Sequence, residues 1–83
     1  MDLIKLHKVK EFAVEQLKKW GLTGSHGNDW CMVWDTKAKR RYGQCRYHKQ
    51  EISVSKQLAN LNSIEESKDV VLHEIAHALT GVG

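Results

Sequence analysis

The C-terminal part of the sequence is constrained most, because a helix is marked there at both of its ends. Ser63-Ile64-Glu65-Glu66 has the spacing of a capping box, with the serine at the N-cap and Glu66 at N3. Gly81 is placed to end the helix, since glycine adopts the left-handed conformation without steric cost. The sequence predicts a buried apolar face on this helix, formed by Val71, Leu72, Ile75, Ala76 and Leu79.

A second helix is expected at the N-terminal end of the chain. Asp2 is a suitable N-cap, and apolar residues recur at the helical period from Leu3 to Trp20. Lys18 and Lys19 stand in the last turn, where cations interact favourably with the helix dipole. Gly21 then provides the stop.

Three strands are expected between the two helices. Alternation and β-forming residue types predict them at 30–36, 41–47 and 51–55, with a loop at 24–29 and a helical turn or short helix at 55–61. Gly43 inside the second strand indicates a bulge or the close approach of another element. The predicted fold class is α+β, with two helices on a small, mostly antiparallel, three-stranded sheet.

The chain has 83 residues, which is enough for one domain and excludes barrels, doubly wound folds and solenoids. No apolar run is long enough to span a membrane, and the first residues lack the apolar core of a secretory signal. We therefore expect an intracellular, cytoplasmic monomer with free thiols at the two cysteines. The large or weakly polar side chains expected in its core are Trp20, Trp30, Trp34, Cys31 and Cys45.

Positive charge is concentrated in one segment, residues 37–49, which contains no acidic residue. Tyr42 and Tyr47 lie between the charges, and charge with interleaved aromatics is typical of surfaces that bind nucleic acid. The alternative is a solvated hairpin whose charges discourage edge-to-edge aggregation. The candidate DNA-binding residues are Lys37, Lys39, Arg40, Arg41, Arg46 and Lys49.

The C-terminal helix contains the motif His73-Glu74-Ile75-Ala76-His77. Residues four apart share a helical face, so His73 and His77 can bind one zinc ion from the same side. Glu74 is one position further round and can act as general base toward a water on that metal. The alternative is a solvated polar face without metal. The capped amphipathic helix and the uncharged flanking residues favour a metal site.

Three segments together resemble the SprT-like family of zinc metallopeptidases. Arg41–Tyr47 matches its strand with a G-x-C step, Glu51–Ser55 its strand ending in I-x-h-S, and Val70–Leu79 its motif hhxHEhxHAh. The resemblance covers about residues 30 to 81. It implies a zincin-like fold, a zinc cofactor and hydrolysis of peptide bonds. In cellular members it also implies action on DNA-bound or DNA-crosslinked proteins.

One element of the family pattern is missing. SprT-like proteins supply a third zinc-ligand histidine shortly after this helix, and this sequence ends at Gly83 without one. The expected explanation is that residues 1–83 are a single domain truncated before that ligand, as a fragment of a longer protein. Two alternatives remain: His48, His26 or His7 substitutes, or the site is degenerate.

The sequence therefore predicts a zinc metallopeptidase with ligands His73 and His77 and general base Glu74, acting on a protein or peptide substrate. Two other functions remain open: a non-catalytic nucleic-acid-binding module, or a partner-binding module, each with a degenerate metal site. In zincin folds an edge strand pairs with extended substrate. The strand 51–55 is a candidate for that role, the alternative is an ordinary interior strand, and the sequence does not decide which strand is the edge.

Overall fold

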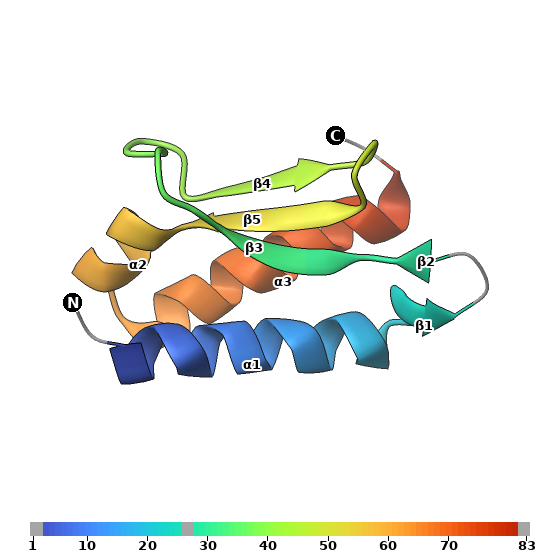
Figure 1. The fold of residues 1–83 in the computed structure, drawn as a ribbon, viewed down its shortest axis with the longest axis horizontal. Coiled ribbons are helices and arrows are strands. Elements are labelled where there is room, and N and C mark those ends of the chain that lie inside the picture. Colours follow the sequence, from blue (N-terminus) through green and yellow to red (C-terminus); the bar gives the residue numbers. More distant parts are fainter. Residues whose placement is uncertain (1–2, 26–27, 82–83) are drawn as a thin grey trace.

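Two long helices pack side by side against one face of a three-stranded sheet (Figure 1). The structure is a computed structural model, and it describes residues 3–25 and 28–81. The elements follow in the order α1 (Leu3–Lys19), β1 (Thr23–Ser25), β2 (Asn28–Asp29), β3 (Cys31–Asp35), β4 (Gly43–Arg46), β5 (Glu51–Ser55), α2 (Lys56–Leu61) and α3 (Ile64–Thr80). The α+β class predicted from the sequence is confirmed.

The sheet has the strand order β3-β5-β4, and its strand directions correct one prediction. β4 and β5 form an antiparallel hairpin, whereas β3 and β5 run parallel, so the sheet is mixed and not mostly antiparallel. Alternation of residue types gives no strand direction. β5 takes the centre because it is the most buried strand, with Ile52, Ser53, Val54 and Ser55 all inaccessible. Of the two alternatives for residues 51–55, the structure therefore has the interior strand, and β3 and β4 are the edges of this sheet.

The helix ends agree with the capping signals. The Ser63 side chain accepts a hydrogen bond from the Glu66 amide at 3.2 Å, and Gly81 has a φ of 74°. Gly21 ends α1 with a φ of 72°. Asp2, expected as the N-cap of α1, lies outside the described residues. Within the expected loop at 24–29, β1 and β2 form a short antiparallel pair instead.

The core lies between the two helices and the sheet. Its buried apolar side chains come from α1 (Val9, Ala13, Leu17), from the strands (Met32, Ile52, Val54) and from α3 (Val71, Ile75). Trp30 is also buried and Trp34 packs against the core, as expected. Trp20 is 50% exposed and Cys31 is exposed, which corrects both predictions, while Cys45 is partly buried.

The buried face of α3 is rotated relative to the predicted one. Leu72 and Leu79 are 40% and 47% exposed, and Ala76 is exposed as well. Ser67 and Glu74 are buried in their place. The polar residues are accommodated because Tyr42, just before β4, provides a hydroxyl partner for Ser67, and Gly43 in β4 leaves space beside Glu74.

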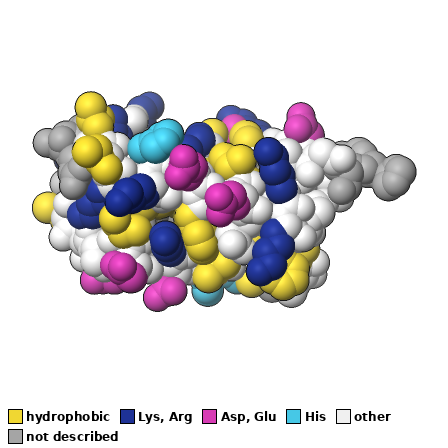
Figure 2. All heavy atoms as spheres, turned by 90° about the horizontal axis from the view of Figure 1, so that it is seen from below, with side chains coloured by type: hydrophobic (Ala, Val, Ile, Leu, Met, Phe, Trp, Pro, Cys, Tyr) yellow, Lys and Arg dark blue, Asp and Glu magenta, His cyan; other side chains and the backbone are white. Residues whose placement is uncertain are grey.

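The side of the molecule where α1 lies is a solvated surface. Figure 2 shows basic, acidic and hydrophobic side chains interspersed on the face seen from below, where α1 lies. The exposed side chains of His7 and Glu11 also lie on α1, with His7 Nε2 3.3 Å from Glu11 Oε2. Among the described residues, no helix has the length and apolar character needed to cross a membrane.

Candidate metal centre

The two motif histidines converge on the outer side of α3. Their Nε2 atoms are 3.0 Å apart, and their rings meet edge-to-face with centroids separated by 4.5 Å. His73 is exposed and His77 is half-buried. Two nitrogens bound to one tetrahedral zinc ion, each at about 2.0–2.1 Å, lie roughly 3.3 Å apart. The two Nε2 atoms therefore need to move only slightly apart for both to bind one zinc ion.

A third protein ligand is not found near this pair. No group of three or more His, Cys, Asp or Glu side chains suited to a metal occurs within residues 3–25 and 28–81. Neither His7, paired with Glu11 on α1, nor His48, in the turn after β4, joins the two histidines. His26 lies outside the described residues. The described part of the chain thus offers a two-histidine site.

Glu74 is buried on the side of α3 that faces β4. Its side chain is only 7% exposed and lies against Gly43 at the start of β4. A Cβ atom at Gly43 would lie 2.9 Å from Glu74 Oε2 and 2.6 Å from Val70 Cγ1. Gly43 therefore leaves the space that the carboxyl group occupies, which is the close approach that the sequence indicated.

The surroundings of Glu74 change its acidity. Burial raises the pKa of the Glu74 carboxyl group, and the neighbouring His73 and His77 act in the opposite direction. A raised pKa lies closer to neutral pH, and a general base is most effective when its pKa is near the working pH. A buried carboxyl beside two convergent imidazoles is a common feature of reactive sites.

Tyr47 and Cys45 complete the surroundings of Glu74 on the β4 side. The Tyr47 hydroxyl donates a hydrogen bond to the backbone carbonyl of His77 at 2.6 Å. Burial raises the pKa of the Cys45 thiol, which lies close enough to Glu74 for the carboxylate to add to the effect. Sequence reasoning assigned Tyr47 to the basic segment and missed this contact. No local pattern reveals it, because it joins residues thirty positions apart.

The basic segment is divided by the fold. Lys37, Lys39, Arg40 and Arg41 are exposed in the loop between β3 and β4, here called the basic loop (residues 36–42). Arg46 is instead held over the sheet by Glu51 at 3.5 Å and Asp35 at 3.8 Å. Lys49 is exposed in the turn at the other end of β4. The six candidate residues therefore do not form one continuous stripe.

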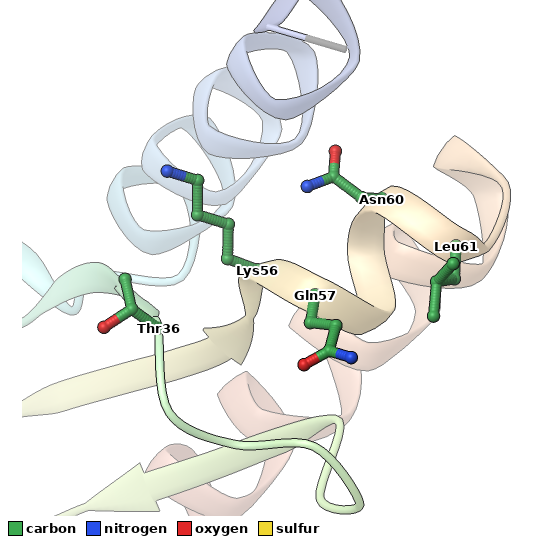
Figure 3. Close-up of a pocket in the computed structure, with 5 residues that line it drawn as sticks. All are labelled: Thr36, Lys56, Gln57, Asn60 and Leu61. Atoms are coloured by element: carbon green, nitrogen blue, oxygen red, sulfur yellow. The ribbon is translucent and has the colours of Figure 1, made fainter. Parts of the chain in front are cut away.

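Two surface hollows lie near these elements. One, of about 340 Å³, follows β4 and the turn after it, from Gln44 to Lys49. The other, of about 400 Å³, lies beside α2, at the far end of the sheet from the C-terminal end of α3 (Figures 1 and 3). Lys56 is the one ionisable side chain in its lining, which otherwise consists of Thr36, Gln57, Asn60 and Leu61. That lining offers no reactive group.

Comparison with known families decides the relationship. The model of the SprT-like family matches residues 10–82, which include the sheet, Gly43 and the two histidines with Glu74. The chain belongs to the SprT-like family. Searches of curated proteins and of solved structures gave no match to this SprT-like chain. The family resemblance noted in the sequence is thus confirmed.

Proposed function

We propose that this SprT-like chain is a zinc-dependent metallopeptidase that hydrolyses peptide bonds in protein substrates. The observation that carries the proposal is the convergence of His73 and His77, with Nε2 atoms 3.0 Å apart, on the helix that also holds Glu74. Membership of the SprT-like family supports the same chemistry. We expect the protein to act as a monomer in the cytoplasm.

The proposed roles follow from the chemistry of the side chains. His73 and His77 would bind zinc through Nε2, which requires both imidazoles to be neutral. Bound zinc supplies Lewis acidity and makes a water molecule acidic near neutral pH. Glu74 would accept the proton from that water and pass it to the leaving amine. Its raised pKa suits this exchange better than that of an exposed carboxylate.

The free edge of β4 is a suitable place for the substrate. β4 contacts α3, and within residues 3–25 and 28–81 it has a neighbouring strand on one side only, so its other edge offers backbone groups for pairing. An extended peptide added there would lie along the hollow that follows Gln44 to Lys49. The substrate-pairing role considered for residues 51–55 is thus proposed for β4.

The test combines metal analysis with a protease assay. The purified chain should take up stoichiometric zinc, His73→Ala should abolish this uptake, and Glu74→Gln should retain zinc but lose all cleavage of a protein substrate. Because catalytic zinc normally has three protein ligands, we expect cleavage by the two-histidine site to be slow. Absence of zinc uptake on titration contradicts the proposal. Cleavage that persists in Glu74→Gln removes Glu74 as the base.

A second candidate function is DNA binding, which would direct the peptidase to DNA-associated proteins. The basic loop favours it, because Lys37, Lys39 and Arg40 are exposed together with Arg41 at one end of the sheet. If the basic loop binds DNA but the metal site is degenerate, the protein is the non-catalytic nucleic-acid-binding module. Phosphate contacts of this kind weaken steeply as salt concentration rises.

A matched pair of variants tests the DNA proposal. Arg40→Ala combined with Arg41→Ala should weaken binding to oligonucleotides at low salt. The slope of log affinity against log salt concentration should become shallower, as expected for the loss of about two phosphate contacts. Arg46→Ala is the control, because Arg46 is already engaged by Glu51 and Asp35. If the double variant and the original chain bind oligonucleotides with equal affinity, the basic loop is a solvated surface and does not bind DNA.

A further inference from the structure

The two proposed ligands are not held equally by α3. His73 lies well inside the helix, whereas His77 lies in its last turn, which ends at Thr80. The final carbonyl groups of a helix lack partners within it, and the last turn opens more readily than the middle. A metal ligand in that turn gains from a contact that fixes its backbone from outside the helix.

Tyr47 makes such a contact. Its hydroxyl donates to the His77 carbonyl oxygen at 2.6 Å. The same oxygen accepts the capping hydrogen bond from the Gly81 amide at 3.0 Å and one from the Thr80 hydroxyl at 3.3 Å. Of these three donors, Tyr47 is the one that comes from the sheet side of the molecule, directly after β4.

Tyr47 is itself held firmly. Its ring meets the buried Trp30 edge-on, with centroids 5.9 Å apart and an interplanar angle of 88°. Its carbonyl accepts a hydrogen bond from the Gln50 amide at 3.2 Å, which closes the turn between β4 and β5.

We propose that Tyr47 is a positioning residue for the metal centre: its hydrogen bond to the His77 carbonyl holds the last turn of α3 so that the two imidazoles converge. The inference rests on the proposed zinc function. Tyr47 does not bind the metal, and it acts through the backbone of His77. Outer contacts of this kind typically change metal affinity by about 10- to 100-fold.

Tyr42 provides a matched control within the same structure. It lies just before β4, and its hydroxyl oxygen is 2.6 Å from that of Ser67, in the first half of α3. Tyr42→Phe and Tyr47→Phe therefore each remove a hydroxyl contact of the same length between the β4 region and α3. Tyr47→Phe also removes a contact with the Cys45 side chain. Only Tyr47→Phe affects the turn that contains a proposed ligand.

The experiment measures zinc affinity by competition with a chromogenic chelator, and amide exchange at Gly81 in the metal-free chain. Tyr47→Phe should raise the zinc dissociation constant by about tenfold and accelerate exchange at Gly81. Tyr42→Phe should do neither, although both variants should unfold at lower urea concentration. Unchanged zinc affinity in Tyr47→Phe, or equal weakening in both variants, overturns the inference.

A failure of the proposed function is recognised separately. If the original chain takes up no zinc, the metallopeptidase proposal falls. Gly81 exchange then decides the inference by itself: accelerated exchange in Tyr47→Phe alone supports the positioning role of the hydroxyl, and equal exchange in both variants removes it.

Discussion

At the scale of single residues, Gly43 fixes the relation between β4 and Glu74. A methyl group there would meet Val70 Cγ1 at 2.6 Å and Glu74 Oε2 at 2.9 Å. The Glu74 carboxylate can swing away, but the branched Val70 side chain has little rotamer freedom in a helix. Any larger residue at position 43 would therefore displace the Glu74 carboxylate, strain the packing around Val70, or do both.

We expect Gly43→Ala to lower the free energy of unfolding by roughly 1–3 kcal/mol, the usual cost of overpacking. Urea denaturation measures this change. The double variant Gly43→Ala/Val70→Ala is the control, because it removes the closer of the two contacts. It should lose less stability than the sum of the single variants. Strict additivity would mean that Val70 does not limit the space at residue 43.

Burial of Glu74 predicts a pH dependence of stability. Its pKa is raised in the native state, so the native chain binds this proton more tightly than the unfolded chain does. The contribution of Glu74 to stability is therefore most favourable below its unfolded pKa of about 4.3, and it declines as pH rises through the raised native pKa.

Glu74→Gln removes this decline. With a chelator present to keep the chain metal-free, the stability difference between the variant and the original chain should shift in favour of the variant as pH rises from about 4. It should level off once the native carboxyl group is ionised. Glu15→Gln, at an exposed position of α1, is the control for removing one carboxylate from the chain. A difference that does not vary with pH would show that burial leaves the acidity of Glu74 unchanged.

At the scale of elements, α3 depends on its first turn for a defined start. Ser63 accepts the Glu66 amide hydrogen bond at 3.2 Å, and Glu65 and Glu66 place negative charge beside the helix N-terminus. We expect Ser63→Ala to cost about 1 kcal/mol in thermal or urea unfolding. Ser63→Asp, which keeps an acceptor, should restore most of it. Equal losses in both variants would show that the cap is not the cause.

The ends of α3 could be predicted from the sequence, but its buried face could not. Ser63 and Gly81 act through local backbone geometry, which a short stretch of sequence specifies. The face depends on what packs opposite. Hydrophobicity favours burial of Leu72 and Leu79, yet Glu74 and Ser67 are buried because Gly43 and Tyr42 accommodate them. These contacts come from the start of β4 and the residue before it, far away in the sequence.

The same reasoning separates the parts of the site. The spacing of His73 and His77 is a property of one helix, so the sequence predicts their convergence. The separation of Arg46 from the basic loop depends on strand order, because Asp35 reaches it across β5. The alternation of residues in each strand is compatible with either direction, so the parallel pairing of β3 with β5 was not predictable from it.

At the scale of the whole molecule, zinc binding and unfolding should be coupled. α1, the sheet and α3 share one core, so the helix that carries both proposed ligands unfolds together with the rest. A ligand that binds only the native state stabilises it by an amount that depends on its free concentration. At a concentration 100 times the dissociation constant this amounts to about 2.7 kcal/mol. For a domain of this size, each kcal/mol raises the melting temperature by roughly 4–8 °C.

We therefore expect zinc to raise the melting temperature of the chain progressively as its concentration is increased. His73→Ala should abolish this shift and leave the metal-free melting temperature almost unchanged, because His73 is exposed and its side chain contributes little to the core. Cys31→Ser is the matched control, since it removes another exposed metal-binding group, and it should keep the full shift. Differential scanning fluorimetry at a series of zinc concentrations measures all three chains. A shift that survives in His73→Ala but disappears in Cys31→Ser would place the zinc at the thiol instead of the helix pair.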